Sequence, residues 1–307
     1  MLGIESIGIY IPKNKINNLE QADRFETDRT FLEQKIGAID LPRFEKEETI
    51  TTACTAAFHH LVQKTNIKTS EIECVVLCTQ NPDHQGLPHN SAGIHAALNL
   101  PESCACFDIG LGCSGYVYGL SIIQSFMAAN GMQKGILFTC DPYSRILNEN
   151  DKNTSLLFGD AASATLISNT PNYQLVATKF STRGKDANAL IKKNGHLEMD
   201  GRSVFNFALQ DVPKQIQKIL LETEIDANEV DLFLLHQGSK FMLENVIKRA
   251  GIPKEKAPIR LERTGNTVSS SIPLLLEEDL TKKPKTILMT GFGVGLSWAT
   301  AIYKHVN

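Results

Sequence analysis

The sequence predicts an α/β fold with mostly parallel sheets, in which one structural unit occurs twice. Two observations predict it: short apolar, β-branched runs alternate with segments of helical periodicity, and the second half of the chain repeats features of the first. We expect buried strands at residues 74–79, 135–140, 163–168, 231–236 and 286–291. We expect helices at residues 49–65, 91–100, 113–130, 212–224 and 240–251. Strands that alternate with helices are typical of parallel sheets with helices on their faces.

Three pairs of segments indicate the internal duplication. The segment TNIKTSEIECVVLCTQ at 65–80 aligns with TEIDANEVDLFLLHQG at 223–238, an offset of 158 residues. Two further pairs follow in the same order at offsets of 152 and 151 residues: NLP at 99–101 with GIP at 251–253, and GILFTC at 135–140 with TILMTG at 286–291. We therefore divide the chain near residue 170, into an N-terminal half of residues 1–170 and a C-terminal half of residues 171–307.

The composition narrows the function classes. The 307 residues contain 31 Lys and Arg against 34 Asp and Glu, so no basic surplus exists to neutralise nucleic-acid phosphates. No apolar run approaches the roughly 20 residues that cross a bilayer, and we expect no membrane partner. The first residues, MLGIESIGIYIPKNK, lack the basic start and the small-residue cleavage site of a signal peptide, which predicts a cytoplasmic protein.

One of the seven cysteines is a candidate nucleophile. Glycines and small residues surround Cys113 in DIGLGCSGYVYGL, and an amphipathic helix follows at once. A helix N-terminus lowers the pKa of a thiol, and glycines permit close approach of the backbone. The alternative is a small core residue, which is the commonest use of a free thiol. Cys104 and Cys106 lack a CxxC hairpin and a histidine partner, so we expect no metal site.

Two further side chains lie where catalytic groups gather. His236 ends the expected strand 231–236, and ligands collect at the carboxyl edge of parallel strands. Asn266 precedes the helix that the repeat makes equivalent to the helix after Cys113. An amide and a neutral imidazole offer two donors to one carbonyl oxygen, which stabilises an enolate. The alternatives are a satisfied polar residue for His236 and a helix N-cap for Asn266. The repeat favours a shared site where two helix N-termini meet.

The motifs resemble those of a known family. Five segments spread over nearly the whole chain are similar to the thiolase-fold condensing enzymes, and within them to the β-ketoacyl-acyl carrier protein synthase III group: FDIGLGCSGYVYGL, LLFGDAASATLI, LLHQGSK, RTGNTVSSSIPLLLEE and GFGVGLSWATAIY. The resemblance implies a thiolase-like fold. Its two duplicated α/β halves have mixed five-stranded sheets in a layered α-β-α-β-α arrangement.

The resemblance also implies a two-stage reaction that makes a β-ketoacyl product for fatty-acid or specialised lipid or polyketide biosynthesis. Cys113 would take an acyl group from acyl-CoA or another acyl thioester, with the backbone N–H groups of Cys113 and Val294 as the oxyanion hole. Malonyl-acyl carrier protein would then lose CO₂ while His236 and Asn266 hydrogen-bond its thioester carbonyl. Phe205 would help to exclude water. No metal or cofactor is implied, because CoA and phosphopantetheine thioesters are substrates.

The sequence departs from the family where CoA is bound. Phe31 replaces the tryptophan that stacks on adenine, and Ser239 replaces the asparagine of the usual HQAN segment. Lys35 and Lys152 replace two arginines. Lysine lacks the bidentate fork of arginine, and phenylalanine offers a smaller stacking face. The donor therefore stays open between acyl-CoA and an acyl carrier protein.

The resemblance extends to protein partners. Leu87 matches a position that reaches across a dimer into the partner's acyl pocket, which implies a homodimer. Lys240, Lys248 and Arg249 share one expected helix and predict a docking surface for an acidic carrier protein, the alternative being an ordinary solvated face. Two other functions remain open. They are acyl transfer from Cys113 to a hydroxyl or amine without condensation, and a non-catalytic partner subunit.

Overall fold

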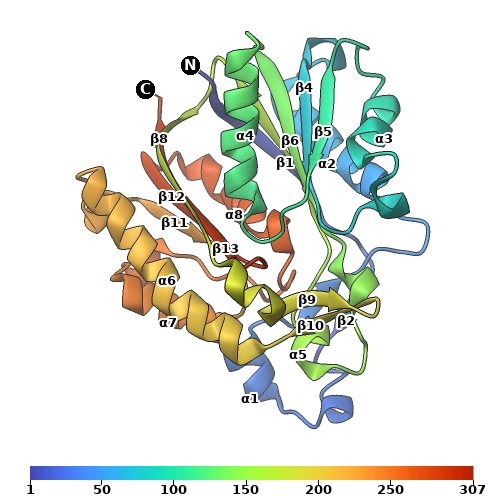
Figure 1. Cartoon of the computed structure of the whole chain (residues 1–307), viewed down its shortest axis with the longest axis vertical. Coiled ribbons are helices and arrows are strands. Elements are labelled where there is room, and N and C mark those ends of the chain that lie inside the picture. The colour runs from blue at the N-terminus through green and yellow to red at the C-terminus, as the bar shows by residue number, and fades with distance from the viewer. Residues whose placement is uncertain (307) are drawn as a thin grey trace.

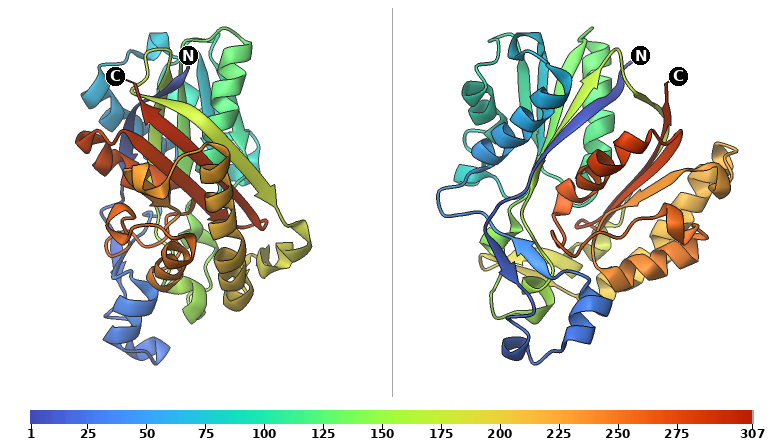
Figure 2. Two further views of the ribbon diagram at one scale, coloured as in Figure 1. Left: turned by 90° about the vertical axis from the view of Figure 1, so that its left-hand side faces the viewer. Right: turned by 180° about the vertical axis from the view of Figure 1, so that it is seen from behind.

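The computed structural model describes residues 1–306, and in this part of the chain nine strands form one large sheet. The strand order is β11-β12-β13-β8-β1-β7-β6-β4-β5. The strands are β1 (Gly3–Tyr10), β4 (Cys74–Cys78), β5 (Ala105–Ile109), β6 (Lys134–Cys140), β7 (Ala162–Ser168), β8 (Tyr173–Thr182), β11 (Leu232–Leu235), β12 (Thr286–Gly293) and β13 (Ser297–His305). Figures 1 and 2 show the sheet running through the whole molecule.

The sheet consists of two parts that meet at a narrow junction. Strands β1, β7, β6, β4 and β5 come from the first half of the chain, and β8, β13, β12 and β11 come from the second. The parts join where Gly3 and Ile4 of β1 pair with Gln174 and Tyr173 of β8. The proposed division near residue 170 falls in the connection between β7 and β8.

The strand count differs from the expectation in the second half. The first half supplies five strands as expected, but the second half supplies four within the described residues. The segment with β5 follows helix α3 (Asn90–Ala97), and residues 251–266 follow helix α7 (Lys240–Ala250) in the corresponding place. Residues 251–266 form turns and a short 3-10 helix but no strand. Their sequence, GIPKEKAPIRLERTGN, contains two prolines, which cannot donate to a strand ladder, and a run of charged residues.

The expectation of mostly parallel sheets is wrong, and the mixed sheet that the family resemblance implies is correct. Only β4 with β5, β4 with β6, and β11 with β12 pair in parallel among the described strands. The other neighbours run antiparallel, as β12 and β13 do across the hairpin at residues 293–297. The alternation of strands and helices missed these pairs for two reasons. Strand β12 connects to β13 without an intervening helix, and β1, which was not among the expected strands, lies antiparallel between β7 and β8.

Helices lie on both outer faces and between the two parts of the sheet, which confirms the layered arrangement (Figures 1 and 2). Helices α2 (Ile50–Thr65) and α3 (Asn90–Ala97) cover the first part, and α6 (Gly201–Glu222) and α7 (Lys240–Ala250) cover the second. Helices α4 (Gly115–Ala129) and α8 (Ser271–Asp279) contact strands of both parts. Their apolar side chains share one core cluster, including Tyr116, Leu120, Ile123, Ile272 and Leu276.

Helix α6 begins eleven residues earlier than the sequence predicts, at Gly201 instead of residue 212. Pro213 resembles a first-turn proline, but it lies inside the helix. The true N-cap is Asp200, whose carboxylate accepts hydrogen bonds from the backbone N–H groups of Arg202 and Ser203. The additional N-terminal turns of α6 therefore include Phe205, a residue expected in the substrate pocket.

Short elements complete the lower part of the molecule in Figure 1. Strands β2 (Lys15–Asn17) and β3 (Asp40–Pro42) pair with each other, as do β9 (Leu190–Lys193) and β10 (His196–Met199). Two short helices, α1 (Arg29–Phe31) and α5 (Lys152–Ser155), lie in the same region. Among the described residues, no helix combines the length and the apolar character that a membrane crossing requires.

Candidate active site

One cavity of about 380 Å³ brings together the three candidate catalytic residues, Cys113, His236 and Asn266. Five predicted substrate contacts line the same cavity: Phe31, Lys35, Lys152, Phe205 and Ser239. These residues come from six separate segments of the chain. A second hollow, of about 470 Å³, is lined mainly by polar and charged residues and includes none of these eight. The three candidate catalytic residues therefore share the first cavity.

The nucleophile loop packs against the end of β12. A methyl group at Gly293 would lie 2.7 Å from both Cβ and Sγ of Cys113, and one at Gly291 would lie 2.6 Å from the Cys113 carbonyl oxygen. Only glycine permits this approach at both positions. The approach lets the backbone N–H of Val294 donate a hydrogen bond to the Cys113 sulfur. This is the backbone group that the sequence assigns to the oxyanion hole.

Cys113 has a raised pKa, not the lowered one that its position before α4 suggests. Burial, as the largest cause, raises the pKa of the thiol to about 12, and the hydrogen bond from Val294 opposes this shift. The expectation of a lowered pKa is wrong. The helix N-terminus favours the thiolate, but Cys113 is only 4% exposed and the loss of solvent disfavours the thiolate more strongly. At neutral pH the resting residue is a thiol.

His236 is a neutral imidazole held in an apolar setting. It directly follows β11, and its backbone N–H donates to the Thr290 carbonyl of β12 at 2.9 Å. Its ring meets the Phe292 ring edge to face, with centroids 5.5 Å apart, and its Nδ1 lies 2.8 Å from Ser271 Oγ. Burial lowers the pKa of His236 to about 3, so the ring is uncharged at neutral pH.

Asn266 is fixed by the first half of the chain. Its backbone N–H donates to the Leu157 carbonyl at 2.8 Å, and its carbonyl accepts from the Gly159 N–H at 3.0 Å. Its Oδ1 accepts the backbone N–H of Val268 at 2.9 Å. The amide oxygen is thus occupied, and Nδ2 has no hydrogen-bond partner within residues 1–306. The side chain therefore offers N–H donors to the cavity that it lines.

Aromatic rings and lysines form the mouth of the cavity. Phe205 stacks on Phe241 with the ring planes 5° apart and the centroids 5.4 Å apart. The Lys35 ammonium lies 3.6 Å from the centroid of Phe241, and the Lys152 ammonium lies 4.8 Å from that of Phe31. Phe241 was not predicted as a site residue. It lies in the first turn of α7, two residues after the predicted site residue Ser239.

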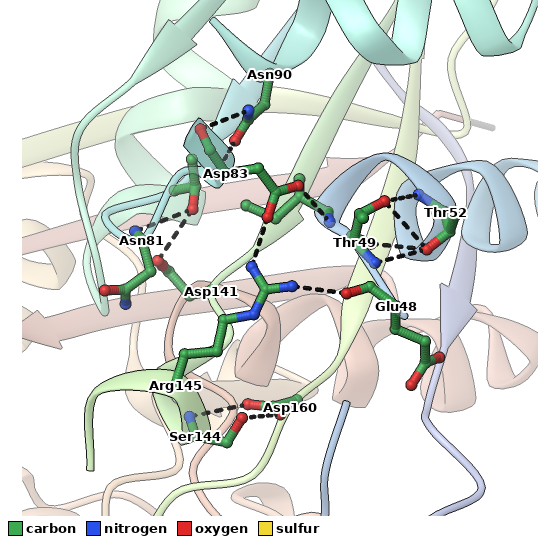
Figure 3. Close-up of polar contacts among 12 residues, drawn as sticks. Glu48, Thr49, Thr52, Asn81, Asp83, Asn90, Asp141, Ser144, Arg145 and Asp160 are labelled. Atoms are coloured by element: carbon green, nitrogen blue, oxygen red, sulfur yellow. Dashed lines mark hydrogen bonds and ion pairs between the residues drawn. The ribbon is translucent and has the colours of Figure 1, made fainter. Parts of the chain in front are cut away.

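The structure does not bring Leu87 into this cavity. Leu87 lies on the loop between β4 and α3, and 85% of its surface is exposed. A polar network fixes this loop (Figure 3): the Arg145 guanidinium donates to the Asp83 carboxylate at 2.5 Å and to the Glu48 carbonyl at 2.7 Å. Asn90 Oδ1 accepts the Asp83 N–H at 2.9 Å. An exposed leucine thus stands on a well-anchored loop.

The three basic residues predicted for docking differ in their surroundings. Lys248 and Arg249 are exposed in the last turn of α7. The Lys240 ammonium instead donates to the Glu33 carbonyl at 3.1 Å and to Gln34 Oε1 at 3.3 Å. Lys240 therefore ties α7 to the segment that contains Lys35. Ser239 caps α7 by accepting the Met242 N–H at 3.4 Å.

Two family models match parts of this chain. Residues 107–184 match the family model described as 3-oxoacyl-[acyl-carrier-protein (ACP)] synthase III, and residues 220–305 match the model of its C-terminal region. A relative from Lactococcus lactis subsp. cremoris, named β-ketoacyl-[acyl-carrier-protein] synthase III, is 28% identical over 95% of this chain and 96% of its own.

Solved structures extend the likeness to the whole fold. A crystal structure of a 3-oxoacyl-(acyl-carrier-protein) synthase III superposes with a TM-score of 0.93 at 29% identity, covering 99% of each chain. The synthase III of Aquifex aeolicus gives a TM-score of 0.92 at 27% identity, covering 99% of this chain and all of its own. The chain, an enzyme of the condensing type, belongs to the β-ketoacyl-acyl carrier protein synthase III family of the thiolase fold.

Proposed function

We propose that this enzyme is an acyltransferase that condenses an acyl thioester with malonyl-acyl carrier protein through an acyl-Cys113 intermediate. The observation that carries the proposal is the shared cavity, in which a buried thiol faces a neutral imidazole and an amide with free N–H donors. Neither half-reaction needs a metal or a redox cofactor, because both only move electron pairs among thioesters and a carboxylate.

In the first stage the Cys113 sulfur attacks the carbonyl carbon of the acyl thioester. The backbone N–H groups of Cys113 and Val294 stabilise the oxyanion that develops, a role supported by the hydrogen bond from Val294 to the sulfur. The old carbon–sulfur bond breaks, and the proton of the Cys113 thiol leaves with the departing thiol. The acyl group is then held as a thioester of Cys113.

In the second stage the malonyl thioester loses CO₂. His236 and Asn266 donate hydrogen bonds to its thioester carbonyl, which becomes an enolate oxygen as the carbon–carbon bond to CO₂ breaks. The enolate carbon attacks the acyl carbon on Cys113 and the carbon–sulfur bond to Cys113 breaks. The released Cys113 sulfur takes up one proton from solvent and returns to the thiol, which balances the loss of the malonyl carboxylate as CO₂. A neutral imidazole suits this role because its donor does not require an additional charge in the buried cavity.

The mouth of the cavity bears on the choice of acyl donor. Phe31 and Lys152, and Lys35 with Phe241, pair an aromatic ring with an ammonium group. An ammonium group near the entrance suits a phosphate, which is common to CoA and to the phosphopantetheine of a carrier protein. Phe205, stacked on Phe241, would limit the entry of water. We propose acyl-CoA as the donor, with an acyl carrier protein as the alternative.

The proposal includes two protein partners. A second copy of this chain would cover the outer edge of β5, the last strand in the sheet, where Phe107 packs on Phe126 and both rings are only partly buried. The exposed Leu87 on its anchored loop supports this homodimer. Lys248 and Arg249 would meet the acidic carrier protein. The seven free thiols suit a cytoplasmic location.

Two measurements test the proposal. Intact-protein mass spectrometry after incubation with acyl-CoA is expected to show one acyl adduct, which disappears in Cys113→Ala and persists in Cys54→Ala, a buried thiol of α2 outside the cavity. Malonyl-acyl carrier protein is expected to release CO₂ when it meets the acylated enzyme. Absence of any adduct would support a non-catalytic subunit, and acyl transfer to a hydroxyl or amine without CO₂ release would support the second acyltransferase reaction.

A further inference from the structure

The hydroxyl of Ser271, the first residue of α8, lies between three polar groups behind the imidazole of His236. Its Oγ is 2.8 Å from His236 Nδ1, 3.0 Å from the Val268 carbonyl oxygen and 3.4 Å from the Gln237 backbone nitrogen. Ser271 is buried, and within residues 1–306 it is the only side chain that hydrogen-bonds the ring. The Val268 backbone carbonyl is also within hydrogen-bond reach of the ring, and the apolar Phe292 ring packs against it edge to face.

A hydroxyl has one hydrogen to donate, so Ser271 faces a choice. The Gln237 N–H can only donate to Oγ, which leaves the hydroxyl hydrogen for His236 Nδ1 or for the Val268 carbonyl. If the hydrogen goes to Val268, then Nδ1 must itself be protonated to bond Oγ, and a lone pair at Nε2 is left for the cavity. If it goes to Nδ1, then Nε2 bears the proton.

The two tautomers have opposite effects on an enolate. A lone pair at Nε2 would repel the enolate oxygen that the Asn266 amide stabilises, whereas an Nε2–H group would add a second donor. We propose that Ser271 is a positioning residue: it donates to Nδ1 and thereby holds His236 as the Nε2–H tautomer. The choice of tautomer rests on the proposed function, because the distances around Ser271 allow either arrangement.

Nuclear magnetic resonance tests the tautomer without any substrate. The protein is labelled with ¹⁵N in its histidine rings, and the His236 signals are identified by their loss in His236→Gln. In the wild type, Nε2 is expected to have the protonated and Nδ1 the bare nitrogen shift. In Ser271→Ala the proton is expected to move to Nδ1, which can then donate to the Val268 carbonyl. Ser271→Thr keeps the hydroxyl and should keep the wild-type pattern.

A matched control is available one residue away. Ser270 is equally buried in the same turn, but its hydroxyl lies 3.2 Å from the Thr139 carbonyl and 3.1 Å from the Ala161 carbonyl, away from the ring. Ser270→Ala should therefore leave the His236 spectrum unchanged. A wild-type ring protonated at Nδ1, or a Ser271→Ala ring that keeps its proton at Nε2, would overturn the proposal.

Kinetics then separates positioning from folding. Ser271→Ala should slow CO₂ release from malonyl-acyl carrier protein by about tenfold, the value of a typical hydrogen bond in the transition state, and Ser271→Thr should restore most of it. The acylation of Cys113 should not change, because that step uses the backbone donors of the oxyanion hole. Equal slowing of both stages would contradict the positioning role. Failure of the wild type to become acylated would contradict the proposed function and leave the tautomer result standing.

Discussion

The floor and the mouth of the cavity are built differently. At the floor, backbone geometry places the chemistry: Gly293 lets β12 touch Cys113, and two backbone hydrogen bonds clamp Asn266. At the mouth, side chains of short or exposed segments meet one another, as Lys35 and Phe241 do. The reaction therefore depends on backbone contacts at the floor, which tolerate few substitutions. The choice of acyl donor depends on side chains at the mouth, each of which can be substituted without moving the backbone.

The largest expected effect is at the floor, in Asn266→Asp. The aspartate can still accept the Val268 N–H, so the local fold is kept, but the two N–H donors are replaced by a negative charge beside the developing enolate. CO₂ release should fall by about a hundred- to a thousandfold, the cost of one lost oxyanion donor. Acylation of Cys113, measured by mass spectrometry on the same sample, should persist. Loss of both stages would mean that Asn266 acts mainly through the structure.

Gly293→Ala tests whether the floor depends on backbone contact. The new methyl group would lie 2.7 Å from the Cys113 sulfur, so either the nucleophile or β12 must move. Cys113 acylation, followed by the rate of adduct formation, should slow by about a hundredfold, which a displacement of about 1 Å can produce. Gly184→Ala, where no atom lies within 4 Å of the added carbon, is the matched control. An unchanged rate in Gly293→Ala would refute the backbone account of the floor.

At the mouth, Phe241→Ala should have a smaller and different effect. It removes the ring on which Phe205 stacks and over which the Lys35 ammonium lies. We expect the KM for the acyl donor to rise by about three- to fivefold, with kcat nearly unchanged, from the loss of one stacked pair and one cation–π contact. Phe180→Ala, an exposed ring that packs on Tyr118 outside the cavity, is the control. A fall in kcat would show that mouth and floor are coupled.

The last prediction concerns stability at acidic pH and not catalysis. Unfolded His236 takes up a proton near its usual pKa of 6.5, but the folded residue resists protonation down to about 3. The free energy of unfolding should therefore fall as the pH drops from 6.5 toward 3. Each pH unit in this range should raise the equilibrium constant for unfolding by at most about tenfold. His236→Gln should show a weaker fall in urea unfolding across this range, and equal slopes for the two proteins would contradict the assignment.

Asp141 acts in the opposite direction and is present in both proteins of that comparison. Burial raises its pKa from 3.8 to about 7, so the fold favours its protonated form. Its contribution to stability is complete below 3.8 and is lost as the pH rises through 7. The difference between wild type and His236→Gln removes this contribution, which is why the difference, and not either curve alone, reports on His236.

Local sequence patterns predicted many helices and strands, together with the three catalytic candidates at the cavity floor. They did not predict the direction of strand pairing or all the residues at the cavity mouth. Cys113, His236 and Asn266 each lie directly beside a strand end or a helix start, so neighbouring residues located them. The start of α6 was missed because Pro213 resembles a proline in the first turn of a helix. The apolar residues of α6 are spaced as in one helix from Gly201 onward, and this longer pattern determines where the helix begins. Strand direction was missed because β13 follows β12 without a helix, and because β1 pairs antiparallel with β7 and β8, which are distant from it in the sequence.

Long-range packing explains what the sequence did not show at the site. The raised pKa of Cys113 depends on burial by residues distant in the chain, and no motif reports it. Phe241 and Lys240 had no assigned role in the cavity, because their partners Phe205, Lys35 and Glu33 belong to other segments. Residues that act through neighbours in space require the fold to be known first.

The backbone clamp on Asn266 makes the two halves chemically dependent on each other. Leu157 and Gly159 of the first half hold the amide that serves the thiol of that same half. Neither half, produced separately, would possess a complete reaction centre, even if each folded. Both halves must therefore be present, and joined in this geometry, before one cavity can hold all three side chains.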